Sequence, residues 1–120
     1  MKTARVYTQK QRFISFRNTY HGQSLATMAL GMPECDIAKI KPVLEGITQI
    51  SFPETSESMS DAETITNFEK SLRSELEKGD VAGVVTEAGI ITGWGSTKIA
   101  PQGFASVIRS LTKEFGCLWI

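Results

Sequence analysis

Two apolar segments of this chain each pass directly into a loop of polar and aromatic residues. Residues 12–22 read RFISFRNTYHG, and a second segment begins with VAGVVTEAG at Val81. The alternating pattern of the first and the continuous apolar run of the second are typical of β-strands. Open α/β sheets bind ligands at the carboxyl ends of their strands. We therefore expect a ligand site where these two segments end.

Strand and helix patterns alternate along the rest of the chain. The expected strands are residues 12–17, 47–52, 81–86 and 117–120, and the expected helices are residues 1–8, 24–30, 61–78 and a segment after Pro101 that ends at Gly116. Residues 35–46 are expected to be irregular with one weak helical stretch. This order favours an α/β fold with a mainly parallel sheet, flanking helices and right-handed crossovers.

The helix expected at residues 61–78 has the clearest signals. Ser60 and Glu63 form an S-x-x-E capping box at its start, and Gly79 supplies a C-terminal stop. One face is apolar, formed by Ile65, Phe68, Leu72 and Leu76. Pro101 suits the first turn of the next helix, which carries a similar apolar stripe.

Composition narrows the class of protein. Thirteen basic and thirteen acidic residues cancel among 120, so no nucleic-acid or anionic-membrane partner is predicted. No apolar run approaches the roughly 20 residues of a membrane span, and the N-terminus lacks the apolar core of a secretory signal. Cys117 fits a small buried hydrophobe, and nothing supports a disulfide with Cys35 or a zinc site. A reduced cytoplasmic protein is expected.

Two loop residues are candidates for chemistry. His21 is the only histidine and stands between Tyr20 and Gly22 after the first strand. Its pattern fits either an imidazole presented to a ligand or a loop histidine without a role. Glu87 follows the buried strand directly, so its carboxylate lies either in the crevice above the sheet or in water.

The loop at residues 88–100 contains three glycines, at positions 89, 93 and 95. Their spacing is not that of a phosphate-binding G-x-G-x-x-G motif, so a turn-rich loop is expected. Trp94 lies between two of these glycines. It is interpreted either as a contact for a ligand or another chain, or as packing on its own domain.

Four segments in order resemble the class III aminotransferases, which are pyridoxal-phosphate enzymes of fold type I. The segments are MKTARVYT, RFISFRNTYHGQSL, VAGVVTEAG and APQGFASVIRSLTKEFGCLWI, and together they span most of the chain. The resemblance implies that residues 1–120 form a single partial domain, an internal portion of the cofactor-binding large domain. It also implies pyridoxal phosphate as the cofactor.

The resemblance assigns cofactor-binding positions residue by residue. Tyr20 matches the aromatic residue that lies against the cofactor ring, and His21 and Gly22 match the next two motif positions. Gly22 lets the backbone pass close to the cofactor. Glu87 matches a strand-end glutamate that lies near the cofactor and often pairs with an arginine. The sequence departs from the family at Ala88, where a proline is usual, and its loop to residue 103 is about two residues longer.

No catalytic residue is expected within this chain. The family's Schiff-base lysine and the aspartate that pairs with the pyridine nitrogen are expected after Ile120, and the phosphate-binding turn before Met1. The isolated chain is therefore expected to be inactive. The parent is expected to be a homodimer that moves an amino group between an amine or amino acid and a keto acid. The alternatives are a pyridoxal-phosphate isomerase or decarboxylase of the same fold, and a non-catalytic small α/β binding domain.

Overall fold

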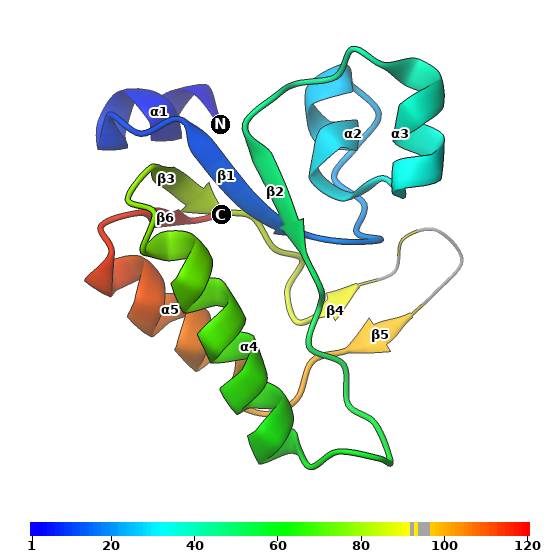
Figure 1. The fold of residues 1–120 in the computed structure, drawn as a ribbon, viewed down its shortest axis with the longest axis vertical. Helices are drawn as coiled ribbons and strands as arrows, with labels where there is room; N and C mark the ends of the chain where they lie inside the picture. Colours follow the sequence, from blue (N-terminus) through cyan, green and yellow to red (C-terminus); the bar gives the residue numbers. More distant parts are fainter. Residues whose placement is uncertain (92, 94–96) are drawn as a thin grey trace.

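A computed structural model describes residues 1–91, 93 and 97–120. Its central sheet has four parallel strands in the order β2-β1-β3-β6 (Figure 1). They are β1 (Arg12–Phe16), β2 (Ile47–Ile50), β3 (Val81–Val84) and β6 (Leu118–Trp119). This arrangement confirms the predicted parallel sheet, and it places all four carboxyl ends at one edge.

Helices cover both faces of the sheet (Figure 1). Residues of α1 (Lys2–Thr8) and α2 (Leu25–Gly31) pack on one face, with α3 (Glu34–Ile40) beside α2. Residues of α4 (Asp61–Leu76) and α5 (Phe104–Glu114) pack on the other face. The predicted α/β architecture with flanking helices is therefore correct.

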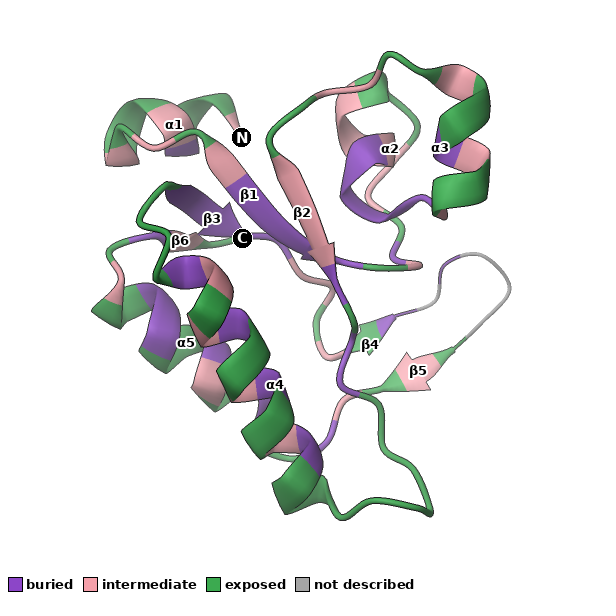
Figure 2. Cartoon of the chain, in the orientation of Figure 1, coloured by how far each residue is buried: buried purple, intermediate pink, exposed green. Residues whose placement is uncertain are grey.

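The larger apolar cluster lies between the sheet and the α4–α5 pair. Four phenylalanine rings lie at its centre, with centroids 5.3 to 5.9 Å apart in tilted or edge-on contacts: Phe16, Phe52, Phe68 and Phe104. The predicted face of α4 is buried at Phe68, Leu72 and Leu76, and Figure 2 shows β3 and most of β1 buried as well. The sheet is thus a rigid support for the loops at its ends.

The signals at the ends of α4 act as predicted. The hydroxyl of Ser60 accepts the N–H of Glu63, and the Glu63 carboxylate accepts the N–H of Ser60 at 3.1 Å. Gly79 adopts φ +79° just beyond the helix, which a residue with a side chain rarely does. The capping box and the glycine stop are therefore confirmed.

Two predictions of local structure, for residues 88–100 and for Pro101, were wrong. Residues 88–100 are not only a loop, because β4 (Ile90–Ile91) and β5 (Lys98–Ile99) pair as an antiparallel hairpin. Strands of two residues are too short to show a periodic pattern. The helical stretch expected within residues 35–46 is present as α3, which begins one residue earlier and spans Glu34–Ile40, with irregular chain after it. Pro101 lies in a turn before α5, whose N-cap is Gly103 at φ +100°.

Candidate functional site

β1 and β3 are neighbours in the sheet, and the connections that follow them run over opposite faces of it. From β1 the chain passes to α2 on one face, and from β3 it passes through the hairpin to α5 on the other. Neighbouring parallel strands whose connections diverge leave a crevice at their carboxyl ends. The loops that carry Tyr20, His21 and Glu87 lie at this end of β1 and β3, and this position is called the crevice below.

The loop after β1 turns sharply and presents Tyr20 outward. Thr19 is buried, and its hydroxyl donates to the Phe16 carbonyl at 2.7 Å. Asn18 adopts the left-handed conformation at φ 62°, which asparagine tolerates better than most residues. The Tyr20 side chain remains 50% exposed. Its ring is therefore available for stacking on a flat ligand.

Glu87 joins the ends of the two strands. Its carboxylate oxygen Oε1 accepts the backbone N–H of Tyr20 at 2.9 Å, across 67 positions of sequence. No arginine within residues 1–91, 93 and 97–120 forms an ion pair with Glu87. The glutamate is half-buried just after β3 and binds the backbone amide of Tyr20, and its predicted place beside a cofactor stays a prediction.

His21 is the least satisfied group of the site. Its ring nitrogen Nε2 is buried and has no hydrogen-bond partner in the part of the chain that the structure describes. Burial lowers the pKa of His21 below its usual value, and the negative charge of Glu87 opposes this shift. A buried polar atom without a partner is unfavourable by about 1–3 kcal/mol, so such groups are rare and need an explanation. A polar ligand atom in the crevice would supply the missing partner.

The backbone at Gly22 needs glycine. Gly22 adopts φ +111°, and a Cβ there would lie 3.2 Å from Oγ1 of Thr27. Both the torsion and the close contact disfavour a side chain. The glycine therefore fixes how the loop enters α2, whose N-cap is Ser24. Its predicted contact with a cofactor stays a prediction.

The sequence reasoning missed Trp119 as a residue of this edge. The indole Nε1 donates to the Thr86 hydroxyl at 2.8 Å, which joins the carboxyl ends of β6 and β3. The side chain is 37% exposed. An aromatic residue near the end of the last apolar segment was the available signal. Trp94, also considered as a ligand contact, lies outside the described residues.

Three further observations limit what this part of the molecule can bind. Among the residues that the structure describes, no group of histidine, cysteine, aspartate and glutamate side chains could hold a metal ion. A hollow of about 600 Å³ lies beside β2 and α3, lined among others by Arg17, Ile37 and Gln49. None of the predicted site residues lines it, and the candidate site is placed between β1 and β3 by the strand order and by the bond from the Tyr20 amide to Glu87. Within the described chain, no helix is long and apolar enough to cross a membrane.

Comparison with known families agrees with this geometry. The sequence model of the family 'Aminotransferase class-III' matches residues 1–120, and the chain belongs to this family. Over 120 residues the chain is 28% identical to adenosylmethionine-8-amino-7-oxononanoate aminotransferase of Geobacter sulfurreducens, covering 93% of this chain and 26% of the relative. It is 26% identical to isoleucine 2-epimerase of Lentilactobacillus buchneri, covering 99% of this chain and 28% of the epimerase.

Solved structures share the fold. Taurine:2-oxoglutarate aminotransferase of Bifidobacterium kashiwanohense, solved with PLP and glutamate, superposes with a TM-score of 0.79 at 19% identity. The match covers 98% of this chain and 28% of that one. The fold is that of fold type I pyridoxal-phosphate enzymes, as predicted. The chain spans about a quarter of the length of the curated relatives it matches.

Proposed function

We propose that the crevice between β1 and β3 forms part of a pyridoxal phosphate site in an aminotransferase. The enzyme would move an amino group between an amine or amino acid and a keto acid. Membership of the class III family supports this proposal. The structural observation that carries it is the buried, unpartnered Nε2 of His21, which lies in the loop after β1 at the carboxyl edge of the sheet.

The residues of the crevice fit a flat, polar cofactor. The half-exposed ring of Tyr20 would stack on the pyridine ring, and His21 Nε2 would hydrogen-bond a polar atom of the cofactor or substrate. Glu87 would keep the loop in place through the Tyr20 amide. Pyridoxal phosphate, when bound, supplies the electron sink for the reaction. The lysine that forms the Schiff base is proposed to lie outside residues 1–120.

The lowered pKa of His21 has a chemical consequence. Burial is the larger cause, so the imidazole stays neutral near pH 7. A neutral imidazole can either donate or accept one hydrogen bond at Nε2, depending on its tautomer. His21 would therefore orient a bound group without adding a positive charge to the site.

The setting of the enzyme is also part of the proposal. We infer that the natural polypeptide is a cytoplasmic homodimer that acts on small molecules, with no nucleic-acid or membrane partner. The balanced charge of the chain supports the part of this inference that concerns nucleic acid and membrane. Exposed apolar side chains on α1 and α2, namely Val6, Tyr7 and Leu25, are consistent with coverage by further protein surface.

The test is cofactor binding and turnover by the natural polypeptide that contains these residues. The purified protein is expected to show the visible absorbance of bound pyridoxal phosphate and to lose it on addition of an amino donor. A keto acid should then restore the absorbance and appear as the corresponding amino acid. A protein that binds no pyridoxal phosphate would overturn the proposal and favour a non-catalytic binding domain.

A second candidate is epimerisation of an amino acid, and the similarity to isoleucine 2-epimerase favours it. This reaction would use the same cofactor and crevice but no keto acid. The distinguishing measurement is the configuration of a single amino acid after incubation in heavy water. Inversion with deuterium at the α-carbon and no keto acid requirement would indicate an epimerase. Transfer of the amino group without inversion would indicate an aminotransferase.

A further inference from the structure

The peptide of Tyr20 is enclosed on two sides by glycines from distant parts of the chain. Gly31, at the end of α2, lies so close to Thr19 that a Cβ would overlap the Thr19 carbonyl oxygen and hydroxyl. A Cβ on Gly93 would lie 2.7 Å from the Asn18 carbonyl oxygen and 3.1 Å from the Tyr20 nitrogen. The loop that presents Tyr20 is therefore held between α2 and the segment after β4.

Close approach to another part of the backbone requires a glycine at position 93. Gly93 is buried, so a side chain added there would have to fit between groups that are already packed. The atoms that a Cβ would meet all belong to the backbone of residues 18–20, and Cβ atoms do not approach other atoms within 3.0 Å. The backbone cannot rotate away as a side chain could, so an added methyl group must displace the loop.

A second contact fixes the same peptide from the end of β3. Glu87 Oε1 accepts the Tyr20 N–H, the same nitrogen against which Gly93 lies. His21 is the next residue, so any displacement of the Tyr20 peptide also moves the imidazole and its buried Nε2. Positions 87 and 93 thus flank the hairpin strand β4 and act on one peptide.

We propose that Gly93 is a positioning residue, which together with Glu87 fixes the Tyr20 peptide and so aims Tyr20 and His21 at the ligand. The connection that contains the β4–β5 hairpin thereby supports the loop at residues 17–22, which carries Tyr20 and His21. This inference rests on the proposed function for the identity of the ligand, but not for the contacts. A misplacement of about 1 Å can reduce a reaction rate roughly 100-fold, so a small shift of this loop matters.

The first test is Gly93→Ala in the natural polypeptide. Hydrogen exchange of peptides covering residues 17–23 is measured without cofactor. It is expected to be about tenfold faster than in wild type, because the displaced Tyr20 N–H no longer bonds Glu87 as tightly. The kcat/KM for amino transfer is expected to fall at least about tenfold. The exchange readout is independent of activity. If the polypeptide bound no pyridoxal phosphate, the proposed function would fail while the exchange would still decide the role of Gly93.

Gly89→Ala is the matched control. Gly89 lies in the same connection, and no atom outside its neighbours lies within 4 Å of a Cβ built there. Its φ of +86° strains an alanine, so this variant adds strain to the same connection without adding an atom against the loop. Exchange at residues 17–23 and kcat/KM are expected to stay within about twofold of wild type. Equal effects of both variants would overturn the role of close approach.

If Gly93→Ala does not fold, Glu87→Ala and Glu87→Gln test whether contacts from this connection fix the Tyr20 peptide. Glu87→Ala removes the acceptor without adding bulk and is expected to accelerate exchange at Tyr20 about tenfold. Glu87→Gln keeps an oxygen that accepts the Tyr20 N–H, so it is expected to restore slow exchange. Unchanged exchange in Glu87→Ala, or in a folded Gly93→Ala, would overturn the proposal.

Discussion

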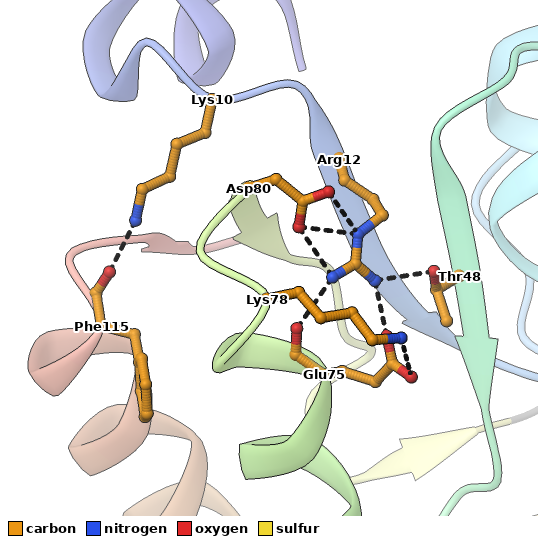
Figure 3. Close-up of polar contacts among 7 residues, drawn as sticks. All are labelled: Lys10, Arg12, Thr48, Glu75, Lys78, Asp80 and Phe115. Carbon is orange, nitrogen blue, oxygen red and sulfur yellow. Dashed lines mark hydrogen bonds and ion pairs between the residues drawn. The ribbon is translucent and has the colours of Figure 1, made fainter.

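The two ends of the central sheet are built in opposite ways. At the amino end, the Arg12 side chain is 14% exposed, and its five N–H groups all donate to Asp80, Glu75 or Thr48 (Figure 3). At the carboxyl end, His21 Nε2 has no partner among the described residues, and Tyr20 is half exposed. The charged side chain at the amino end has all its hydrogen bonds made, whereas the imidazole at the carboxyl end has a ring nitrogen without a partner among the described residues.

This difference separates stability from binding. A fully satisfied network of charged groups fixes the strands that it joins, and here it links β1 to β2, to the end of α4 and to the residue before β3. Lys10 adds a bond to the carbonyl of Phe115 beyond α5, at 2.7 Å (Figure 3). The carboxyl end leaves a group unsatisfied where a ligand could complete it. Variants at the two ends should therefore affect different measurements.

The largest effect is expected from Arg12→Met. Removing the guanidinium leaves Glu75 and Asp80 without their shared partner, and the free energy of unfolding should fall by about 3 kcal/mol. Urea unfolding of the natural polypeptide measures it, and cofactor affinity should stay unchanged. The control is Arg73→Met, whose exposed pair with Glu114 should contribute less than about 1 kcal/mol. Equal losses in both variants would contradict a special role for Arg12.

Tyr20→Ala should have the opposite profile. Loss of an aromatic stacking partner should weaken pyridoxal phosphate binding about tenfold, or about 1.4 kcal/mol. Because Tyr20 is half exposed, the free energy of unfolding should change by less than about 0.5 kcal/mol. Tyr20→Phe keeps the aromatic ring and should therefore retain both affinity and stability. Loss of stability without loss of affinity in Tyr20→Ala would assign Tyr20 to the framework.

A smaller effect is expected in the acid range, at the amino end. The hydrogen bond from Arg12 lowers the pKa of Asp80, and bonds from Lys78 and then Arg12 lower the pKa of Glu75. Their contribution to stability is therefore complete above the ordinary values of 3.8 and 4.5, and it is lost as the pH falls through the lowered ones. Unfolding measured below pH 4.5 should depend less on pH in Arg12→Met. An unchanged slope would contradict the coupling.

The smallest effect is expected at the carboxyl end, in a different pH range. The pKa of His21 lies below 6.5 when folded, so below pH 6.5 the unfolded chain binds a proton that the folded chain does not. Stability should therefore fall as the pH drops from 6.5 toward the folded pKa. The difference in unfolding free energy between wild type and His21→Gln, measured from pH 7 to about 5, isolates this contribution. A difference that does not vary with pH would indicate an exposed histidine.

Local pattern predicted much of the framework. The alternation at residues 12–17 and the apolar run after Val81 identified two central strands, and the capping box at Ser60 identified the start of α4. These signals depend on neighbours in sequence, so they can be seen without a structure. The position of Glu87 at a strand end also followed from the chain order.

Long-range contacts could not be predicted in the same way. Arg12 and Asp80 are 68 positions apart, and their pairing depends on the strand order β1-β3 and its register. The bond between Glu87 and the Tyr20 amide needs both loops to turn as they do. Gly93 was expected to serve a turn, whereas it allows close approach to a backbone that the sequence cannot place. The hairpin itself has strands too short for any pattern.

The most direct test of the account is a structure of the natural polypeptide with pyridoxal phosphate. The cofactor ring should lie at the carboxyl ends of β1 and β3, with its centroid about 4.5–7 Å from that of Tyr20. A polar atom of the cofactor or substrate should lie within hydrogen-bond distance, about 2.7–3.2 Å, of His21 Nε2. A cofactor bound elsewhere, with His21 Nε2 still unpartnered, would contradict the assignment of this crevice as the site.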